Sequence, residues 1–227
     1  MNRRKEAEDF LNQFPDLGFR QEGFTKIFEE LLNKNKSEYL IIETGTVRKK
    51  DNWRGDGQST RIFDKFVNQY GGIVVSIDND PVAIDLAKNL VSDKVHFITG
   101  DSVRFLDKCP FKQEIDLLYL DSYDSSFHPT NDTDESKIRE YYKQNHLSAL
   151  HVLKELCAVW TSLPDGCLVL TDDNVTQSLL DRFNKNMDSS AKYEYQAKEG
   201  KGLYFRDFME NLDRQPFIDE YQLGYIK

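Results

Sequence analysis

The sequence contains no long apolar run. None of its segments approaches the roughly 20 consecutive apolar residues that a membrane-spanning helix requires. It has three cysteines, Cys109, Cys157 and Cys167, which are widely spaced and form no C-x-x-C pair. This pattern argues against a disulfide framework and against a cysteine-based zinc site, and it favours reduced thiols. The basic residues at the start of the chain are not followed by an apolar segment, so we expect no secretory signal and a cytoplasmic location.

The sequence has fewer basic than acidic residues. The 227 residues include 30 Lys and Arg against 39 Asp and Glu, which gives a formal net charge of −9. Because such a chain is repelled by a phosphate backbone, nucleic acid is a poor candidate partner. The hydrophobic fraction of 39% is sufficient for a core, and the length suits one large α/β domain.

Two phosphate-binding patterns are also absent. The sequence has no G-x-G-x-x-G and no G-x-x-x-x-G-K-[ST]. Both patterns use glycines to bring the backbone close to a phosphate. Their absence argues against a standard dinucleotide site and against a P-loop nucleotide hydrolase.

What the sequence does have is a regular alternation of strand-like and helix-like segments. The strand-like segments are short, apolar and rich in β-branched residues, as is typical of strands buried on both faces. They span residues 38–43, 72–78, 95–99, 115–121 and 166–172. Helical patterns lie between them at 59–70, 80–90 and 136–160, the last with Leu150 and Val159 on its expected apolar face.

This order predicts an α/β fold, namely a Rossmann-like, doubly wound and mostly parallel sheet with helices on both faces. We expect residues 1–36 to form an N-terminal helical extension and residues 37–227 to form the Rossmann-like domain. Near the C-terminus, residues 191–198 and 221–227 could be closing strands at an antiparallel edge, with a helix over 203–212 between them.

The segment IIETGTVRKKDNWRGDGQST (41–60) starts as a buried strand, ends at a glycine turn, and continues through polar residues to a second glycine pair. In a nucleotide-binding turn, an acidic residue lies about 20 residues beyond the glycines. Asp78 lies 21 residues after Gly57, but 33 residues after the first glycine. We therefore predict one loop interrupted by an insertion over 47–54, with Trp53 as the anchor of the insertion.

Acidic residues follow or end all five predicted strands. They are Glu43, Asp78, Asp101, Asp121 and the pair Asp172 and Asp173. In an open parallel sheet, ligands bind outside the carboxyl ends of the strands, and ionised carboxylates there can accept ribose hydroxyls. Each aspartate alone could instead be a helix N-cap, which fits Asp101 well. Five acidic strand ends together predict a nucleoside-binding site.

At these motifs the chain resembles the class I S-adenosylmethionine-dependent methyltransferases, over residues 39–174. The similarity lies in IIETG, VVSIDND, ITGDS and DLLYLDSYD, in that order. The resemblance implies S-adenosylmethionine as cofactor, with its methionine part near the first motif, its ribose at the second and its adenine at the third. The cofactor-binding residues that it implies are Glu43, Gly45, Thr46, Gly57, Ser59, Asp78, Asn79, Asp101, Ser102 and Asp121.

The segments LYLDSYD and LVLTDDNV resemble a narrower branch, the catechol-type and macrocin-type O-methyltransferases. That resemblance implies a site for Mg²⁺ or another divalent metal. In the catechol-type arrangement the implied metal ligands are Asp121, Asp173 and Asn174, and in the macrocin-type arrangement they are Asp121, Asp172 and Asp173. A hard divalent cation prefers oxygen ligands and lowers the pKa of a bound substrate hydroxyl. The metal-free alternative is that residues 172–174 cap the helix that follows them.

The general base is left open. In the catechol-type branch a lysine follows the first aspartate by three residues, whereas this chain has Asp124 there. Asp124 could add a metal ligand, and His128 or His146 could act as base, although a lone histidine is more often structural. The candidate catalytic residues are therefore Asp121, Asp124 and His128.

Three functions are compatible with the sequence. The first is an S-adenosylmethionine-dependent methyltransferase that O-methylates a small hydroxylated acceptor with the help of a divalent metal. The second is a metal-independent methyltransferase that acts on nitrogen or on a protein. The third is a non-catalytic S-adenosylmethionine-binding protein of the same fold. The N-terminal helices could in addition provide the contact of a homodimer.

Overall fold

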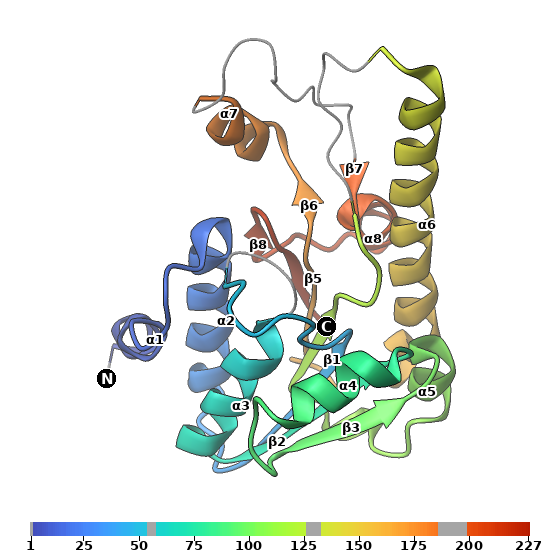
Figure 1. Ribbon diagram of the computed structural model, residues 1–227. Helices are drawn as coiled ribbons and strands as arrows, with labels where there is room; N and C mark the ends of the chain where they lie inside the picture. Colours follow the sequence, from blue (N-terminus) through green and yellow to red (C-terminus); the bar gives the residue numbers. More distant parts are fainter. Residues whose placement is uncertain (1, 54–57, 126–132, 186–198) are drawn as a thin grey trace.

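The computed structural model describes residues 2–53, 58–125, 133–185 and 199–227 (Figure 1). Its helices are α1 (Arg3–Leu11), α2 (Gln21–Asn33), α3 (Ser59–Tyr70), α4 (Pro81–Lys88), α5 (Ser102–Lys108), α6 (Glu135–Val159), α7 (Gln177–Lys185) and α8 (Gly202–Glu210). Its strands are β1 (Tyr39–Thr44), β2 (Gly72–Asp78), β3 (Val95–Thr99), β4 (Leu117–Leu120), β5 (Leu168–Thr171), β6 (Asn174–Val175), β7 (Glu199–Gly200), β8 (Ile218–Asp219) and β9 (Leu223–Ile226). Short 3-10 helices cover Gly18–Arg20, Lys112–Glu114 and Trp160–Ser162.

Seven strands form one sheet in the order β3-β2-β1-β4-β5-β9-β8. Strands β1 to β5 are parallel, whereas β9 is antiparallel to both β5 and β8. The five predicted strands are confirmed, with ends that differ from the predicted ones by two residues at most. The closing strand predicted over 221–227 is confirmed as β9, and the other predicted closing segment, 191–198, lies outside the described residues. A short connection joins β8 to β9, which is compatible with antiparallel pairing and not with a parallel crossover.

Helices cover both faces of the sheet (Figure 1), which confirms the predicted Rossmann-like α/β class. Because successive side chains of a strand point to opposite faces, β1 contributes to two apolar cores. Ile41 packs in the cluster formed with α1, α2 and α3, and Ile42 packs in the cluster formed with α5, α6 and α8. The two faces of the sheet are thus occupied by packing, and the carboxyl-terminal edge is where a ligand can bind.

The N-terminal helices take part in this packing. Phe24, Ile27 and Phe28 of α2 are fully buried in the same cluster as the sheet residues. The rings of Phe28 and Phe66 stack with their centroids 4.8 Å apart. The predicted extension over residues 1–36 is therefore helical, and its second helix packs directly onto the sheet.

The long helix α6 buries a different face from the predicted one. Val159 is buried as expected, but Leu150 is exposed, and the buried positions include the polar residues Ser148 and Glu155. Both polar residues lie in the C-terminal half of α6, where Ser148 Oγ is 3.2 Å from Ser125 Oγ and Glu155 Oε1 is 3.4 Å from His151 Nε2. The N-terminal half of α6 rises above the sheet in Figure 1. Although α6 has 25 residues, it is too polar to cross a membrane. No other helix in the described part of the chain is long and apolar enough to do so.

Candidate cofactor site and acidic cluster at the strand ends

The carboxyl ends of the parallel strands form one edge of the sheet, from which β5 continues upward into β6 in Figure 1. A cavity lies at this edge, around the ends of β1, β2 and β3. It is lined by Gly45, Ile77, Asp78, Asn79, Gly100, Asp101, Ser102, Ser122, Tyr123 and His151. The structure therefore brings together five of the predicted cofactor-binding residues, namely Gly45, Asp78, Asn79, Asp101 and Ser102.

The enclosed part of this cavity is small. It measures about 40 Å³, which holds little more than one water molecule. Tyr123 is 45% exposed at the rim, and Ser122 Oγ is buried without a hydrogen-bond partner among the described residues. A nucleoside therefore requires rim side chains to move, and it would meet a hydroxyl with hydrogen-bonding capacity to spare.

Glu43 of β1 lies beneath the loop rather than in the cavity. The residue is 1% exposed, and its Oε2 accepts hydrogen bonds from Thr60 Oγ1 at 2.7 Å and from Ser76 Oγ at 3.2 Å. Burial raises the pKa of Glu43 to about 8, against the opposing effect of hydroxyl donors. Ser59, another predicted cofactor residue, is fully buried at the first position of α3. Glu43 thus connects β1, β2 and the start of α3.

The two parts of the interrupted loop meet in space. The backbone N–H of Val47 donates to Thr60 Oγ1 at 3.1 Å, which ties the residues after β1 to the first turn of α3. Gly45 has a φ of +86°, and a Cβ at this position would lie 2.4 Å from the carbonyl oxygen of Asp121. Glycine is therefore required at position 45 for both its backbone angle and its lack of a side chain.

Asp78 ends β2 and is half-buried beside the cavity. Its Oδ2 accepts the N–H of Thr46 at 3.1 Å, and its Oδ1 accepts the N–H of Asp80 at 2.8 Å. Burial raises the pKa of Asp78, while these two N–H groups and Arg48 oppose the rise. The backbone bonds hold the carboxylate in one orientation, and each oxygen keeps a lone pair that can accept a ribose hydroxyl.

Asp101 lines the same cavity and also caps a helix. Its Oδ1 accepts the N–H of Arg104 at 2.7 Å at the start of α5. The N-cap alternative is thus confirmed for this residue. It does not compete with cofactor binding, because the second carboxylate oxygen is not used for the cap.

Ser102, His151 and Glu155 form a polar cluster beside the third strand, and two of these residues were missed by sequence reasoning. Ser102 Oγ lies 3.1 Å from His151 Nε2, and the same nitrogen lies 3.4 Å from Glu155 Oε1. Glu155 is fully buried on α6, and the ring centroids of His151 and Tyr123 are 5.2 Å apart. The spacing of His151 and Glu155 by four residues in a predicted helix was the available signal, because such residues share one face.

The described part of the insertion, residues 47–53, is anchored at Trp53 as predicted. The rings of Trp53 and Phe14 lie with centroids 5.7 Å apart, and the guanidinium of Arg61 lies 4.4 Å from the centroid of the Trp53 ring. The insertion is therefore fastened to the α1 side of the molecule and to α3.

The structure does not place Asp124, a predicted catalytic residue, in the acidic cluster. Arg48 Nη1 and Nη2 donate to its two carboxylate oxygens at 3.0 and 2.7 Å, and both side chains are largely exposed. This ion pair connects the insertion to the segment after β4. His146, the alternative base, has its Nδ1 2.9 Å from the hydroxyl of Tyr204 on α8.

Two predicted residues cannot be placed in this arrangement. Gly57, predicted to bind the cofactor, and His128, predicted as a catalytic base, lie outside the described residues. Their roles stay predictions from the sequence.

The four predicted metal ligands do not converge on one point. Asp172 is buried, and its Oδ2 lies 3.0 Å from Arg20 Nη2 and accepts the hydroxyl of Tyr119 at 2.8 Å. Burial raises the pKa of Asp172, and Arg20 opposes the rise. A cationic side chain from the turn before α2 therefore neutralises this carboxylate.

Asn174 is directed towards the C-terminal strands. Its Nδ2 donates to Asp219 Oδ1 at 3.1 Å and to the carbonyl oxygen of Glu220 at 2.8 Å. The alternative in which residues 172–174 cap the next helix is wrong, because α7 begins at Gln177. Thr176 Oγ1 accepts the N–H of Leu179 at 3.2 Å there. Asn174 instead begins β6, where it pairs with Gly200.

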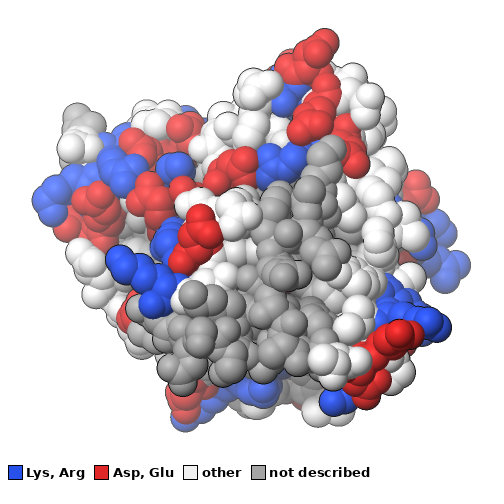
Figure 2. Space-filling model, turned by 90° about the horizontal axis from the view of Figure 1, so that it is seen from above, with Lys and Arg blue, Asp and Glu red and all other residues white. Residues whose placement is uncertain are grey.

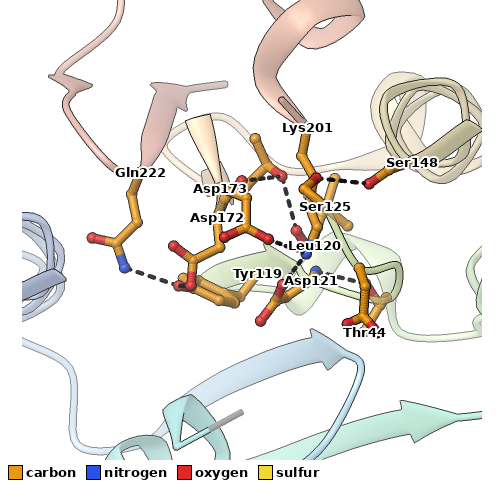
Figure 3. Close-up of polar contacts among 12 residues, drawn as sticks. Thr44, Tyr119, Leu120, Asp121, Ser125, Ser148, Asp172, Asp173, Lys201 and Gln222 are labelled. Atoms are coloured by element: carbon orange, nitrogen blue, oxygen red, sulfur yellow. Dashed lines mark hydrogen bonds and ion pairs between the residues drawn. The ribbon is translucent and has the colours of Figure 1, made fainter. Parts of the chain in front are cut away.

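Asp121 and Asp173 do converge, and the group between them is the ammonium of Lys201 (Figure 3). Lys201 Nζ donates to Asp121 Oδ1 and lies 3.1 Å from Asp173 Oδ2. Lys201 is 1% exposed. Burial alone would lower the pKa of Lys201, but Asp121 and Asp173 outweigh it and raise the pKa. Tyr221 completes the cluster by donating its hydroxyl to Asp173.

These contacts occupy the carboxylates that a divalent metal would need. A cation already lies between Asp121 and Asp173, while Asp172 and Asn174 are bonded to other partners. Within the described residues, no group of three or more His, Cys, Asp or Glu side chains is arranged to hold a metal ion. The residues as arranged therefore do not fit the predicted metal site.

A larger hollow of about 1470 Å³ lies at the opposite, amino-terminal edge of the sheet. Its buried carboxylate, Asp116, is paired with Lys36 at 2.7 Å and with Lys34 at 3.7 Å. Figure 2 shows the other edge from above, where Lys and Arg side chains are interspersed with Asp and Glu over the described part of that face. We place the candidate site at the carboxyl-terminal edge because the glycine turn and the half-buried Asp78 lie there.

Comparisons with known proteins bear on the fold. No protein-family model matches the chain, and no curated protein matches its sequence. A SAM-dependent methyltransferase from Archaeoglobus fulgidus is similar in structure, with 11% identity, 93% of this chain and 69% of that chain covered, and a TM-score of 0.43. Fibrillarin from Aeropyrum pernix, solved with bound S-adenosyl-L-methionine, has 12% identity, coverage of 84% and 67%, and a TM-score of 0.44.

Not every similar structure is a methyltransferase. Serine dehydrogenase from Escherichia coli has 12% identity, coverage of 76% of this chain and 74% of that chain, and a TM-score of 0.47. Identities and TM-scores this low describe a likeness of fold alone.

Proposed function

We propose that this protein is an S-adenosylmethionine-dependent methyltransferase that acts on a small acceptor. The observation that carries the proposal is the cavity at the ends of β1, β2 and β3. It gathers Gly45, Asp78, Asp101 and Ser102, the residues to which the resemblance assigns the methionine, ribose and adenine parts of the cofactor. Sequence motifs spread over about 60 residues thus end at one place in the fold.

The side chains around the cavity suit the parts of this cofactor. Asp78 would accept the ribose hydroxyls, because its carboxylate is oriented by two backbone N–H groups. Ser102 and His151 would meet the adenine, and Gly45 would leave room for the methionine part. When bound, S-adenosylmethionine supplies an electrophilic methyl group.

Asp121 is the residue that we assign to proton transfer. It follows β4 beside Gly45, its N–H donates to the carbonyl oxygen of Thr44 at 3.0 Å, and its side chain is 18% exposed. Lys201 is bonded to Oδ1, so Oδ2 would accept the proton that an acceptor hydroxyl or amine loses. Burial raises the pKa of Asp121, against the opposing effect of Lys201, and a raised pKa makes a carboxylate a better base.

Two classes of methyl acceptor are candidates. O-methylation of a small hydroxylated molecule is our first proposal, as predicted from the sequence. The position of Lys201 supports the metal-independent form of this reaction over the metal-assisted form. The two carboxylates and one ammonium of the cluster keep a single negative charge when all are ionised, so a cationic amine acceptor is the second candidate.

Calorimetric titration with S-adenosylmethionine and with S-adenosylhomocysteine tests the proposal. We expect one molecule of either compound to bind per chain, and we expect methyl transfer to members of a panel of small alcohols, phenols and amines. A chelating agent in the buffer should leave the binding unchanged. If the folded protein binds neither compound, the methyltransferase proposal is wrong.

A further inference from the structure

Lys201 reaches the acidic cluster from a distant part of the chain. It lies between β7 and α8 in the short segment EGKG. Its backbone N–H donates to the carbonyl oxygen of Asp173 at 3.1 Å, and the preceding Gly200 pairs with Asn174 in the ladder of β6 and β7. The backbone of the segment is therefore attached to the residues that follow β5.

Both glycines beside Lys201 permit this close approach. Gly200 has a φ of +75°, and a Cβ there would lie 2.1 Å from the carbonyl oxygen of Asp173. A Cβ on Gly202 would lie 2.2 Å from Asn174 Oδ1. Because neither glycine has a side chain, the backbone packs against the end of β5 and the lysine side chain extends to Asp121 (Figure 3).

The position of the Lys201 ammonium offers some of the ligands that a divalent cation requires. Mg²⁺ is commonly bound in proteins by one or two carboxylates together with water or substrate oxygens. Asp121 and Asp173 present two carboxylate oxygens that face one position, and Lys201 Nζ fills that position. The site thus has the carboxylates of a metal site with an ammonium group in the place of the metal.

We infer that Lys201 is a built-in cation that takes the place of a divalent metal between Asp121 and Asp173. It is a positioning residue, because it acts through Asp121, whose carboxylate it holds at the end of β4. The positioning role of Lys201 rests on the proposed function of Asp121. Its occupation of the metal position does not depend on that function. A lysine has no open coordination positions, so the acceptor has to be bound by other residues.

The substitution Lys201→Ala tests this inference by removing the resident cation. Mn²⁺ binding is measured by the electron paramagnetic resonance signal of free Mn²⁺, in the absence of cofactor and acceptor. We expect no stoichiometric binding by the wild-type protein at millimolar Mn²⁺. We expect Lys201→Ala to bind Mn²⁺ at least about tenfold more tightly than the wild type, because two carboxylates become available to it.

The same variant allows a rescue experiment with Mn²⁺. If Lys201 had only a structural role, Mn²⁺ would not restore the function of the variant. Lys201→Ala should bind S-adenosylhomocysteine more weakly than the wild type, and Mn²⁺ should restore part of this affinity. The double variant Lys201→Ala/Asp173→Asn should lose the gain in Mn²⁺ binding, because it keeps only one of the two carboxylates. Lys143→Ala, at an exposed position on α6, is the matched control and should behave as the wild type.

Two results would overturn the inference. One is stoichiometric Mn²⁺ binding by the wild-type protein that is lost in Asp121→Asn. The other is a folded Lys201→Ala protein that gains no Mn²⁺ affinity. If Lys201→Ala does not fold, Lys201→Gln, which keeps a hydrogen-bond donor near Asp121, takes its place in the same titration. Failure of the methyltransferase proposal would appear separately, as absent cofactor binding by the wild type.

Discussion

The ends of β1 to β3 and the ends of β4 and β5 carry acidic residues at the same edge of one sheet, but the acids have different partners. In the first group, backbone N–H groups hold Asp78 and hydroxyls hold Glu43. In the second group, Arg20 holds Asp172, and Lys201 holds both Asp121 and Asp173.

This difference separates two uses of a carboxylate. Neutral donors orient Asp78 without cancelling its charge, so the carboxylate can still bind a ligand. Cationic partners offset two of the three negative charges of the second group inside the protein, and removing such a partner leaves an unpaired buried charge. Whether an acidic residue at a strand end can bind a ligand therefore depends on whether its partners within the protein are neutral donors or cations.

The substitution Arg20→Met should be the most destabilising. It leaves Asp172 buried without its cationic partner, which should cost about 3 to 5 kcal/mol of the free energy of unfolding. Urea denaturation measures the loss. Arg104→Met, at an exposed position of α5, is the control, and Arg20→Met/Asp172→Asn should recover much of the stability. An equal effect of Arg20→Met and Arg104→Met would show that Asp172 does not depend on Arg20.

Glu43 should make the stability depend on pH. Its pKa in the fold, about 8, lies above the ordinary value of 4.5, so between these values the folded chain holds a proton that the unfolded chain has released. The contribution of Glu43 to stability is therefore full below about pH 4.5 and is lost as pH rises through about 8, by a few kcal/mol.

Glu43→Gln removes this dependence while keeping a side chain of similar shape. Urea denaturation of both proteins at about pH 5 and about pH 8.5 should show the variant gaining in stability relative to the wild type as the pH rises. A difference that stays constant between the two pH values would mean that Glu43 is already ionised in the folded protein.

Asp78→Asn should weaken cofactor binding with little effect on stability. A hydrogen bond to an ionised group contributes about 1.5 to 3 kcal/mol, so the affinity for S-adenosylhomocysteine should fall about 10- to 150-fold. Calorimetry measures this change, and Asp85→Asn on the exposed side of α4 is the matched control. Unchanged affinity in Asp78→Asn would remove Asp78 from the cofactor site.

Arg48→Gln should have the smallest effect on stability. The Arg48–Asp124 pair is exposed on both sides, and such pairs contribute less than about 1 kcal/mol. Thermal denaturation of Arg48→Gln, Asp124→Asn and the double variant should give small losses that are not additive. A loss as large as that of Arg20→Met would mean that the insertion is held in place mainly by this ion pair.

Much of the frame of the protein was predictable from the sequence alone. The five parallel strands, the start of α3 at Ser59 and the cap of α5 at Asp101 agree with the prediction. These features depend on the spacing of apolar residues and on capping side chains, both of which act over a few neighbouring residues. The gathering of Gly45, Asp78 and Asp101 followed from the rule that parallel strands end at one edge.

The partners of the acidic residues were decided by the tertiary structure. Lys201 lies 80 residues from Asp121 in the chain, and no local pattern of EGKG shows that its side chain extends between β4 and β5. Arg20 meets Asp172 because α2 packs on the sheet near the end of β5. The interaction between two charges depends on their distance in space and on their burial, so it is set when the helices and the last strands pack together.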